Sequence, residues 1–208
     1  MLDVMMDIDN RTVWQQAAGD TDRDYADLCL RWGVILNGPA YAGPWPECRQ
    51  ALLTDGWSSR KLTDLRRFAE EMADGDLVVL RLGTSSVLAV GEVVGDYEWR
   101  PEFGDIDGWE IQHARRVRWL WASREQPASF ETYALKQGDT TQRLSSEVVE
   151  KWLAELEIPE SAYQKDLPPL PSLDDSVERM RELGVVVVLG TRGADGAFVR
   201  ADVLGDDE

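Results

Sequence analysis

Two short apolar segments joined by a tight turn constrain the fold of this chain more than any other feature. Residues 76–82 (DLVVLRL) and 86–94 (SVLAVGEVV) are rich in β-branched residues, and Gly83, Thr84 and Ser85 between them favour a turn. The pattern is typical of a β-hairpin with buried strands, because apolar runs this short are the length of a strand. We therefore expect an antiparallel pair at the centre of the domain.

The segments on either side of this hairpin have their own regular patterns. A helix is expected before the hairpin. Ser58 or Ser59 can cap its N-terminus, and the helix ends at Asp74 and Gly75. The apolar face of that helix comprises Leu62, Leu65, Phe68, Ala69 and Met72. After the hairpin we expect a long aromatic loop over residues 97–109, and then a half-buried strand within residues 110–121, where apolar and charged residues alternate.

Shorter patterns complete the expected order of elements. We expect strands at residues 12–16 and 33–36, helices at 19–30 and 145–157, a proline-rich connection at 158–173, a helix at 174–183 and a hairpin of 185–189 with 197–203. The sequence thus predicts an α/β protein with a main domain over residues 11–158. Residues 159–208 are predicted to form a linker and a C-terminal helix–hairpin appendage.

The charge balance limits what such a domain can bind. Of 208 residues, 39 are Asp or Glu and 22 are Lys or Arg, which gives a formal net charge of −17. A surface that is basic overall, as in many duplex-binding proteins, is excluded, so any nucleic-acid contact requires a local basic patch. No apolar run is long enough for a membrane span, and the acidic N-terminus lacks the features of a secretory signal. We expect a cytoplasmic protein.

The residues needed for common catalytic and metal sites are missing or badly spaced. His113 is the only histidine, and Cys29 and Cys48 have neither metal-ligand spacing nor the number for a disulfide framework. The glycine-rich stretch 190–196 leads into an expected strand rather than a helix, which favours a turn over a phosphate loop. The acidic residues at 7–9 and 105–107 are interpreted as solvated loop residues. We therefore expect no catalytic residue, metal or cofactor.

Aromatic residues placed outside the regular elements are the strongest functional feature. Trp57 precedes the capped helix, and Tyr97, Trp99 and Trp109 lie in the predicted long loop. Rings exposed on loops can bracket a flat ligand such as a nucleobase, although the same rings could close one end of a small barrel. Basic residues flank the same region and would form a local cationic rim, namely Arg60, Lys61, Arg66, Arg67, Arg100, Arg115, Arg116 and Arg118.

The stretch GDLVVLRLGTSSVLAVGEVVGDYEW, followed by HARRVRWLW, resembles the core of the EVE/YTH-like branch of the PUA superfamily. It is similar to the recognition domains of modification-dependent restriction systems. The motif-carrying residues are Val90-Gly91-Glu92-Val93, the Trp57-Ser58 pair before the helix and the strand ending near Trp119. The resemblance implies a partly closed β-barrel with flanking helices that holds a flipped, modified base in an aromatic cage.

The resemblance also implies roles for particular residues. Trp57 and Ser58, together with Tyr97 and either Trp99 or Trp109, would bind the base, and Asn37 would read its edge. The flanking phosphates would be bound by Arg60, Lys61, Arg100, Arg115 and Arg116. The implied function is non-enzymatic reading of modified nucleic acid, DNA rather than RNA, in prokaryotic defence with an effector nuclease or ATPase subunit. The alternative is a protein-interaction module whose aromatic loop binds a partner, because Trp, Tyr and Arg also dominate protein interfaces.

Overall fold

The computed structural model describes residues 3–8, 10–104, 106, 108–172, 188–192 and 198–203. The contacts between residues divide the chain into two compact units, Met1–Pro169 and Leu170–Glu208. The boundary predicted from the sequence lies earlier, after residue 158. Among the described residues, no helix is both long and apolar enough to cross a membrane.

A seven-stranded mixed sheet forms the centre of the first unit. Its strands are β2 (Val13–Ala17), β3 (Val34–Asn37), β4 (Leu77–Leu82), β5 (Ser86–Trp99), β6 (His113–Ala122), β7 (Ala128–Ser129) and β8 (Thr141–Arg143). The strand order is β3-β6-β5-β4-β2-β8, with β7 paired to β5. Only β2 and β4 run parallel, and the predicted hairpin is the antiparallel pair β4–β5.

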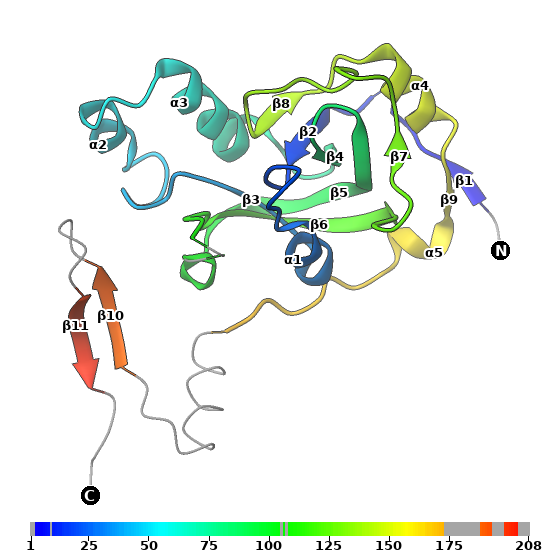
Figure 1. The fold of residues 1–208 in the computed structure, drawn as a ribbon. Coiled ribbons are helices and arrows are strands. Elements are labelled where there is room, and N and C mark those ends of the chain that lie inside the picture. The colour runs from blue at the N-terminus through cyan, green and yellow to red at the C-terminus, as the bar shows by residue number, and fades with distance from the viewer. Residues whose placement is uncertain are drawn as a thin grey trace, which may run out of the picture. The chain divides into compact units, whose positions relative to one another are not determined.

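The sheet curls into a half-barrel, with β3 and β8 at the two ends of the strand order (Figure 1). The predicted α/β class is therefore confirmed at this level. Strands β5 and β6 approach each other closely at Gly91 of β5, which has no side chain to keep them apart. A Cβ at Gly91 would lie 2.9 Å from the backbone oxygen of Arg118 and would also collide with the side chains of Val117 and Trp119, so β6 would have to shift away from β5.

Strand β5 extends five residues beyond the segment that the sequence predicts, and this corrects one expectation. Tyr97 and Trp99 lie on β5 and not in a loop. The sequence Gly95-Asp96 suggests a stop, but the β5–β6 register shifts between Val94 and Glu98 and the pairing then resumes, with Trp99 opposite His113. Gly95 and Asp96 thus form part of a β-bulge, and the strand continues beyond them.

Short helices lie around the half-barrel (Figure 1). They are α1 (Ala26–Trp32), α2 (Arg49–Thr54), α3 (Ser59–Arg66), α4 (Glu147–Ala154) and α5 (Glu160–Tyr163). Helix α3 begins as predicted, since the Ser58 side chain accepts from the Lys61 amide. It continues into η1 (Arg67–Glu71), a π-helical turn in which Met72 N donates to Arg67 O at 2.9 Å. The 3₁₀ turn η2 (Pro101–Phe103) follows β5.

The main hydrophobic core lies between the sheet and helix α4. Its buried residues include Leu77, Val79 and Val90 from the sheet and Val149 and Leu153 from α4. Ile158 and Ala162, which follow α4, are also fully buried in this core. Strand β9 (Glu157–Pro159) pairs antiparallel with β1 (Asp3–Met5), so both ends of the first unit are held together.

The second unit contains β10 (Val188–Arg192) and β11 (Phe198–Val203), which pair antiparallel with a register shift between Leu189 and Gly190. The helix predicted at residues 174–183 lies outside the described residues. The predicted glycine-rich turn at 190–196 lies partly outside them.

Candidate functional site

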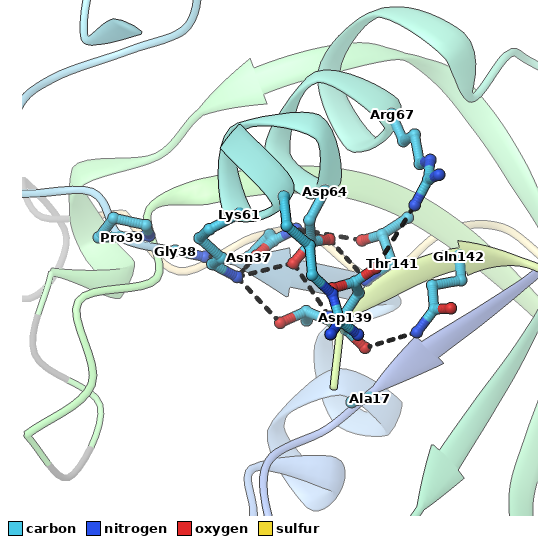
Figure 2. A network of polar contacts seen from close by, with 12 residues as sticks. Ala17, Asn37, Gly38, Pro39, Lys61, Asp64, Arg67, Asp139, Thr141 and Gln142 are labelled. Atoms are coloured by element: carbon cyan, nitrogen blue, oxygen red, sulfur yellow. Dashed lines mark hydrogen bonds and ion pairs between the residues drawn. The ribbon is translucent and has the colours of Figure 1, made fainter. Parts of the chain in front are cut away.

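A buried polar network joins the two edge strands of the half-barrel. Asn37 at the end of β3 donates from Nδ2 to Thr141 Oγ1 on β8 at 3.1 Å and to Asp64 Oδ1 on α3 at 3.2 Å. Its Oδ1 accepts from Gly38 N and Lys61 Nζ. Both hydrogens and both lone pairs of this amide are therefore used within the protein (Figure 2). Asn37, predicted to read a base edge, is placed in the interior.

Asp64 is the acceptor at the centre of this network. Its carboxylate accepts from the amides of Thr140 and Thr141 at 3.0 and 2.7 Å and from Lys61 Nζ at 2.7 Å (Figure 2). A fully buried carboxylate needs such partners, because desolvation of the charge is costly. Through Asp64, helix α3 is hydrogen-bonded both to β3 and to β8, and we call this junction between the two edge strands the seam. Lys61, predicted to contact phosphate, is bound to this network.

Tyr97 and Trp99 lie beside His113. The ring centroids of Tyr97 and Trp99 are 5.8 and 5.0 Å from that of His113. His113 Nε2 is 3.0 Å from Pro39 O, an acceptor only, so Nε2 carries the proton and Nδ1 accepts from Tyr97 OH at 2.8 Å. Burial lowers the pKa of His113 to about 4, so the imidazole is neutral at pH 7. Burial also raises the pKa of Tyr97 to about 12.

Trp57 lies in the connection between α2 and α3, where it packs partly on a second cluster of apolar residues. That cluster is formed by Trp45, Cys48, Leu52, Leu62 and Leu65. The indole Nε1 of Trp57 donates to the exposed Tyr41 OH at 2.8 Å. Ser58, next to it, is occupied as the cap of α3. Tyr97 contacts the same apolar cluster, so Trp57 and Tyr97 share one neighbourhood, and Trp109 lies elsewhere.

Two of the predicted phosphate-binding arginines are bound to backbone carbonyls. Arg115 is 3% exposed and donates to Phe68 O, Ala69 O and Gly95 O, thereby fastening η1 to the sheet. Arg116 is half-buried and donates to Gly33 O and Pro168 O. Burial lowers the pKa of both guanidinium groups, Arg115 and Arg116. Both guanidinium groups are therefore engaged by backbone carbonyls of the protein.

The remaining predicted cations are paired with carboxylates. Arg60 Nε lies 2.6 Å from Asp139 Oδ1, and its side chain is otherwise exposed. Arg100 is flanked by Glu98 and Glu102 at 3.3 Å each. These pairs offset the charges of Arg60 and Arg100.

Trp109 is the one predicted aromatic residue that lines a large pocket in the described part of the chain. The pocket has a volume of about 550 Å³, within the range of ligand sites. Its wall consists of three loops, around residues 19–21, 82–86 and 137–140, and of the rings of Tyr25, Trp109 and Tyr133. Tyr25 meets Trp109 edge to face at 5.9 Å, and the Arg23 guanidinium lies 4.4 Å from the Trp109 ring centroid.

The pocket combines these rings with polar groups of both charges. Tyr133 is 74% exposed and has a φ of 69°, a left-handed conformation that is rare outside glycine. Arg81, buried in the wall, donates to Gly83 O and Asp139 O. Asp20 and Asp139 add carboxylates. Among the described residues, Trp109 Nε1 and Arg81 Nε are buried donors without a partner.

Most of these pocket residues were not predicted. Arg81 reads in sequence as an ordinary strand residue, and Asp20 and Tyr133 lie in segments far from the hairpin. The glycines at 19, 83 and 138, all with positive φ, were the available signal, because they mark the turns that bring the three loops together.

No grouping of three or more His, Cys, Asp or Glu side chains suited to a metal ion occurs within the described residues. The arrangement is therefore an aromatic and hydrogen-bonding pocket, which can bind a flat polar group.

The curled mixed sheet with its short helices defines a half-barrel α/β domain. The chain belongs to the family described as "Domain of unknown function (DUF8426)", whose model matches residues 20–145. This match includes every predicted site residue and all of the pocket-lining residues except Ala17 and Gly19.

A comparison with curated proteins gives no match. Among solved structures, the chain is similar to the YTH domain of the Zygosaccharomyces rouxii MRB1 protein, crystallised in complex with N6-methyladenosine RNA. The identity is 11%, the alignment covers 83% of this chain and 99% of that chain, and the TM-score is 0.40. No residue role follows from a likeness of this degree.

Proposed function

We propose that this domain is a non-enzymatic module that takes one modified base of a nucleic-acid strand into the Trp109 pocket. The observation that carries the proposal is the pocket of about 550 Å³ walled by Trp109, Tyr133 and Tyr25 and by three polar loops. Aromatic walls stack on the faces of a base, and hydrogen-bonding groups around them contact its edge. The sequence analysis named either Trp99 or Trp109 as an aromatic residue of the cage, and in this proposal that residue is Trp109.

The charges of the pocket favour a base over a phosphate. Asp20 places a carboxylate in the wall that repels a phosphate group and can accept N–H groups from a base edge, whereas the Asp139 carboxylate is already paired with Arg60. Thr21, Ser85 and Ser86 in the lining carry hydroxyl groups, each of which can donate to or accept from a ligand. The pocket thus suits an uncharged ring with both donors and acceptors.

Binding of oligonucleotides with and without modified bases tests this proposal. Single-stranded DNA and RNA oligonucleotides carrying methylated, hydroxymethylated or glucosylated bases are titrated in parallel with unmodified ones. Tyr133→Ala removes an exposed ring without disturbing the core, and Trp109→Ala removes the second wall. Each is expected to weaken binding of the preferred oligonucleotide by about five- to 150-fold, since base–aromatic stacking is worth about 1–3 kcal/mol.

Trp57→Ala is the matched control, because it deletes the same side chain outside the pocket. We expect it to bind like the parent. If Trp57→Ala loses affinity while Tyr133→Ala and Trp109→Ala do not, the cage is at the α2–α3 connection and the pocket assignment is overturned. If the parent binds no oligonucleotide, the proposed function itself is wrong.

A biological setting extends the same proposal. Base recognition alone leaves the nucleic acid unchanged, so a role in modification-dependent restriction requires an effector, such as a nuclease or ATPase subunit, in the cytoplasm. Plating of phages with modified and unmodified DNA on cells that carry or lack the gene would test this role. Equal plating on both strains would contradict it.

A further inference from the structure

A small basic cleft lies beside the pocket, formed by residues of α3, η1 and β8 and by the segment before β8. Its lining consists of Arg66, Arg67, Glu71, Lys136, Gln142 and Arg143, and its volume is about 230 Å³. Four cationic side chains thus surround one carboxylate in a chain with a net charge of −17. Such a concentration of positive charge attracts an anion despite the negative charge of the whole molecule.

The local backbone explains why these cations converge. The π-helical turn η1 inserts one extra residue per turn after α3, and such turns redirect side chains and are frequent at functional sites. Arg66 and Glu71, five residues apart, meet as an ion pair of 2.6 Å across this turn. Arg143 reaches the other oxygen of Glu71 at 3.7 Å from β8. Glu71 therefore holds two guanidinium groups, one from each side of the cleft.

The cations remain accessible. The side chains of Arg66 and Arg143 are 45% and 63% exposed. Lys136 is exposed and forms no ion pair with any described residue. A cleft of this size is too small for a whole drug-sized ligand, whose sites start at about 300 Å³, so it suits an anionic group that belongs to a larger molecule.

One chain segment, residues 136–142, separates this basic cleft from the Trp109 pocket. Gln137 and Thr140 line the pocket, whereas Lys136 and Gln142 line the cleft. Asp139 lines the pocket, and its carboxylate lies 3.5 Å from Arg67 Nη1 of the cleft. A strand whose base enters the pocket would therefore pass its backbone over this segment.

We infer that the basic cleft binds the backbone phosphates of the single strand whose base the Trp109 pocket takes, an inference that rests on the proposed function. Arg67, Lys136 and Arg143 supply the positive charge, and Glu71 orients Arg66 and Arg143. These residues replace Arg60, Lys61, Arg100, Arg115 and Arg116 as the phosphate contacts. Phosphate contacts fix the position of the strand and carry no base information.

Salt dependence of binding tests the inference. Lys136→Gln and Arg143→Gln are compared with Arg49→Gln, which removes an exposed positive charge on α2. Each cleft variant is expected to reduce the slope of log Kobs against log salt by about 0.7, the value for one contact to a single strand. The ratio of affinities for modified and unmodified oligonucleotides should not change. Slopes equal to that of Arg49→Gln would overturn the inference.

An abasic oligonucleotide separates this inference from the proposed function, because it keeps the phosphates and lacks the bases. Salt-sensitive binding of the abasic strand that Lys136→Gln weakens and Trp109→Ala does not would support the cleft, even if base selectivity failed. Base-selective binding without any effect of the cleft variants would overturn the cleft alone. Binding of inorganic phosphate with no binding of the abasic strand would assign the cleft to a free anion and overturn the backbone assignment.

Discussion

Asn37 Nδ2 and Thr141 Oγ1 lie 3.1 Å apart and connect strands at opposite ends of the sheet order. The half-barrel is therefore closed here by side chains and not by backbone pairing. Thr141 Oγ1 in turn donates to Gln16 Oε1 on β2 at 2.7 Å. Because hydrogen bonds of side chains replace a ladder of backbone bonds here, substitution of one of these side chains should weaken the link between β3 and β8.

Thr141→Val should destabilise the protein by about 1–3 kcal/mol, since it leaves buried polar groups of Asn37 and Gln16 unpaired. The free energy of unfolding in urea measures the effect. Thr54→Val, on the surface of α2, serves as control and should change stability by less than about 0.5 kcal/mol. A double-mutant cycle with Asn37→Ala should give a coupling energy of at least about 0.5 kcal/mol. Additive effects would contradict a direct link across the seam.

His113 should make stability depend on pH. Its pKa falls from 6.5 to about 4 in the folded protein because the ring is buried. Below pH 6.5 the unfolded chain binds a proton that the folded protein does not, so stability is lost as pH falls from 6.5 toward 4. The loss amounts to about 3 kcal/mol at most, at 1.36 kcal/mol per pH unit.

The measurement for His113 is urea unfolding of the parent and of His113→Gln at pH 7.5 and pH 4.5. Glutamine does not titrate, so the stability advantage of the parent should shrink by about 2–3 kcal/mol at the lower pH. An equal difference between the two proteins at both pH values would show that His113 titrates normally in the folded state.

Arg115 should act on stability and not on phosphate binding. Arg115→Ala leaves the carbonyls of Phe68, Ala69 and Gly95 without their donor, and we expect a loss of about 2–4 kcal/mol. The salt dependence of oligonucleotide binding by the folded fraction should equal that of the parent. A reduced slope with unchanged stability would instead support the role predicted from sequence.

The hairpin and the capped helix before it follow from local patterns, and so they could be predicted. Tyr97 and Trp99 could not be placed, because Gly95 and Asp96 resemble a turn and only pairing with β6 shows that a bulge carries the strand onward. Similarly, Asn37 follows a strand and resembles an exposed loop residue. Its burial depends on Asp64 and Thr141, which lie 27 and 104 positions further along the chain.

The pocket shows the same limit. Trp109 was among the candidates because of its residue type and its place in the predicted loop. Tyr133 and Asp20 join it only when three distant loops converge, and no spacing in the sequence encodes that convergence. The base-binding role of each residue stays a prediction until binding is measured.

Residues 159–169 should belong to the folded domain. Ala162 is fully buried in the main core, and the carbonyls of Lys165 and Pro168 accept from Arg118 and Arg116. A protein ending at residue 169 should therefore unfold cooperatively with the stability of the same unit in the full chain. One ending at residue 158 should be less stable by at least about 2 kcal/mol, because it loses this packing and both acceptors. Urea unfolding of the two truncated proteins measures the difference. Equal stabilities would place the boundary at residue 158, where the proline-rich stretch begins.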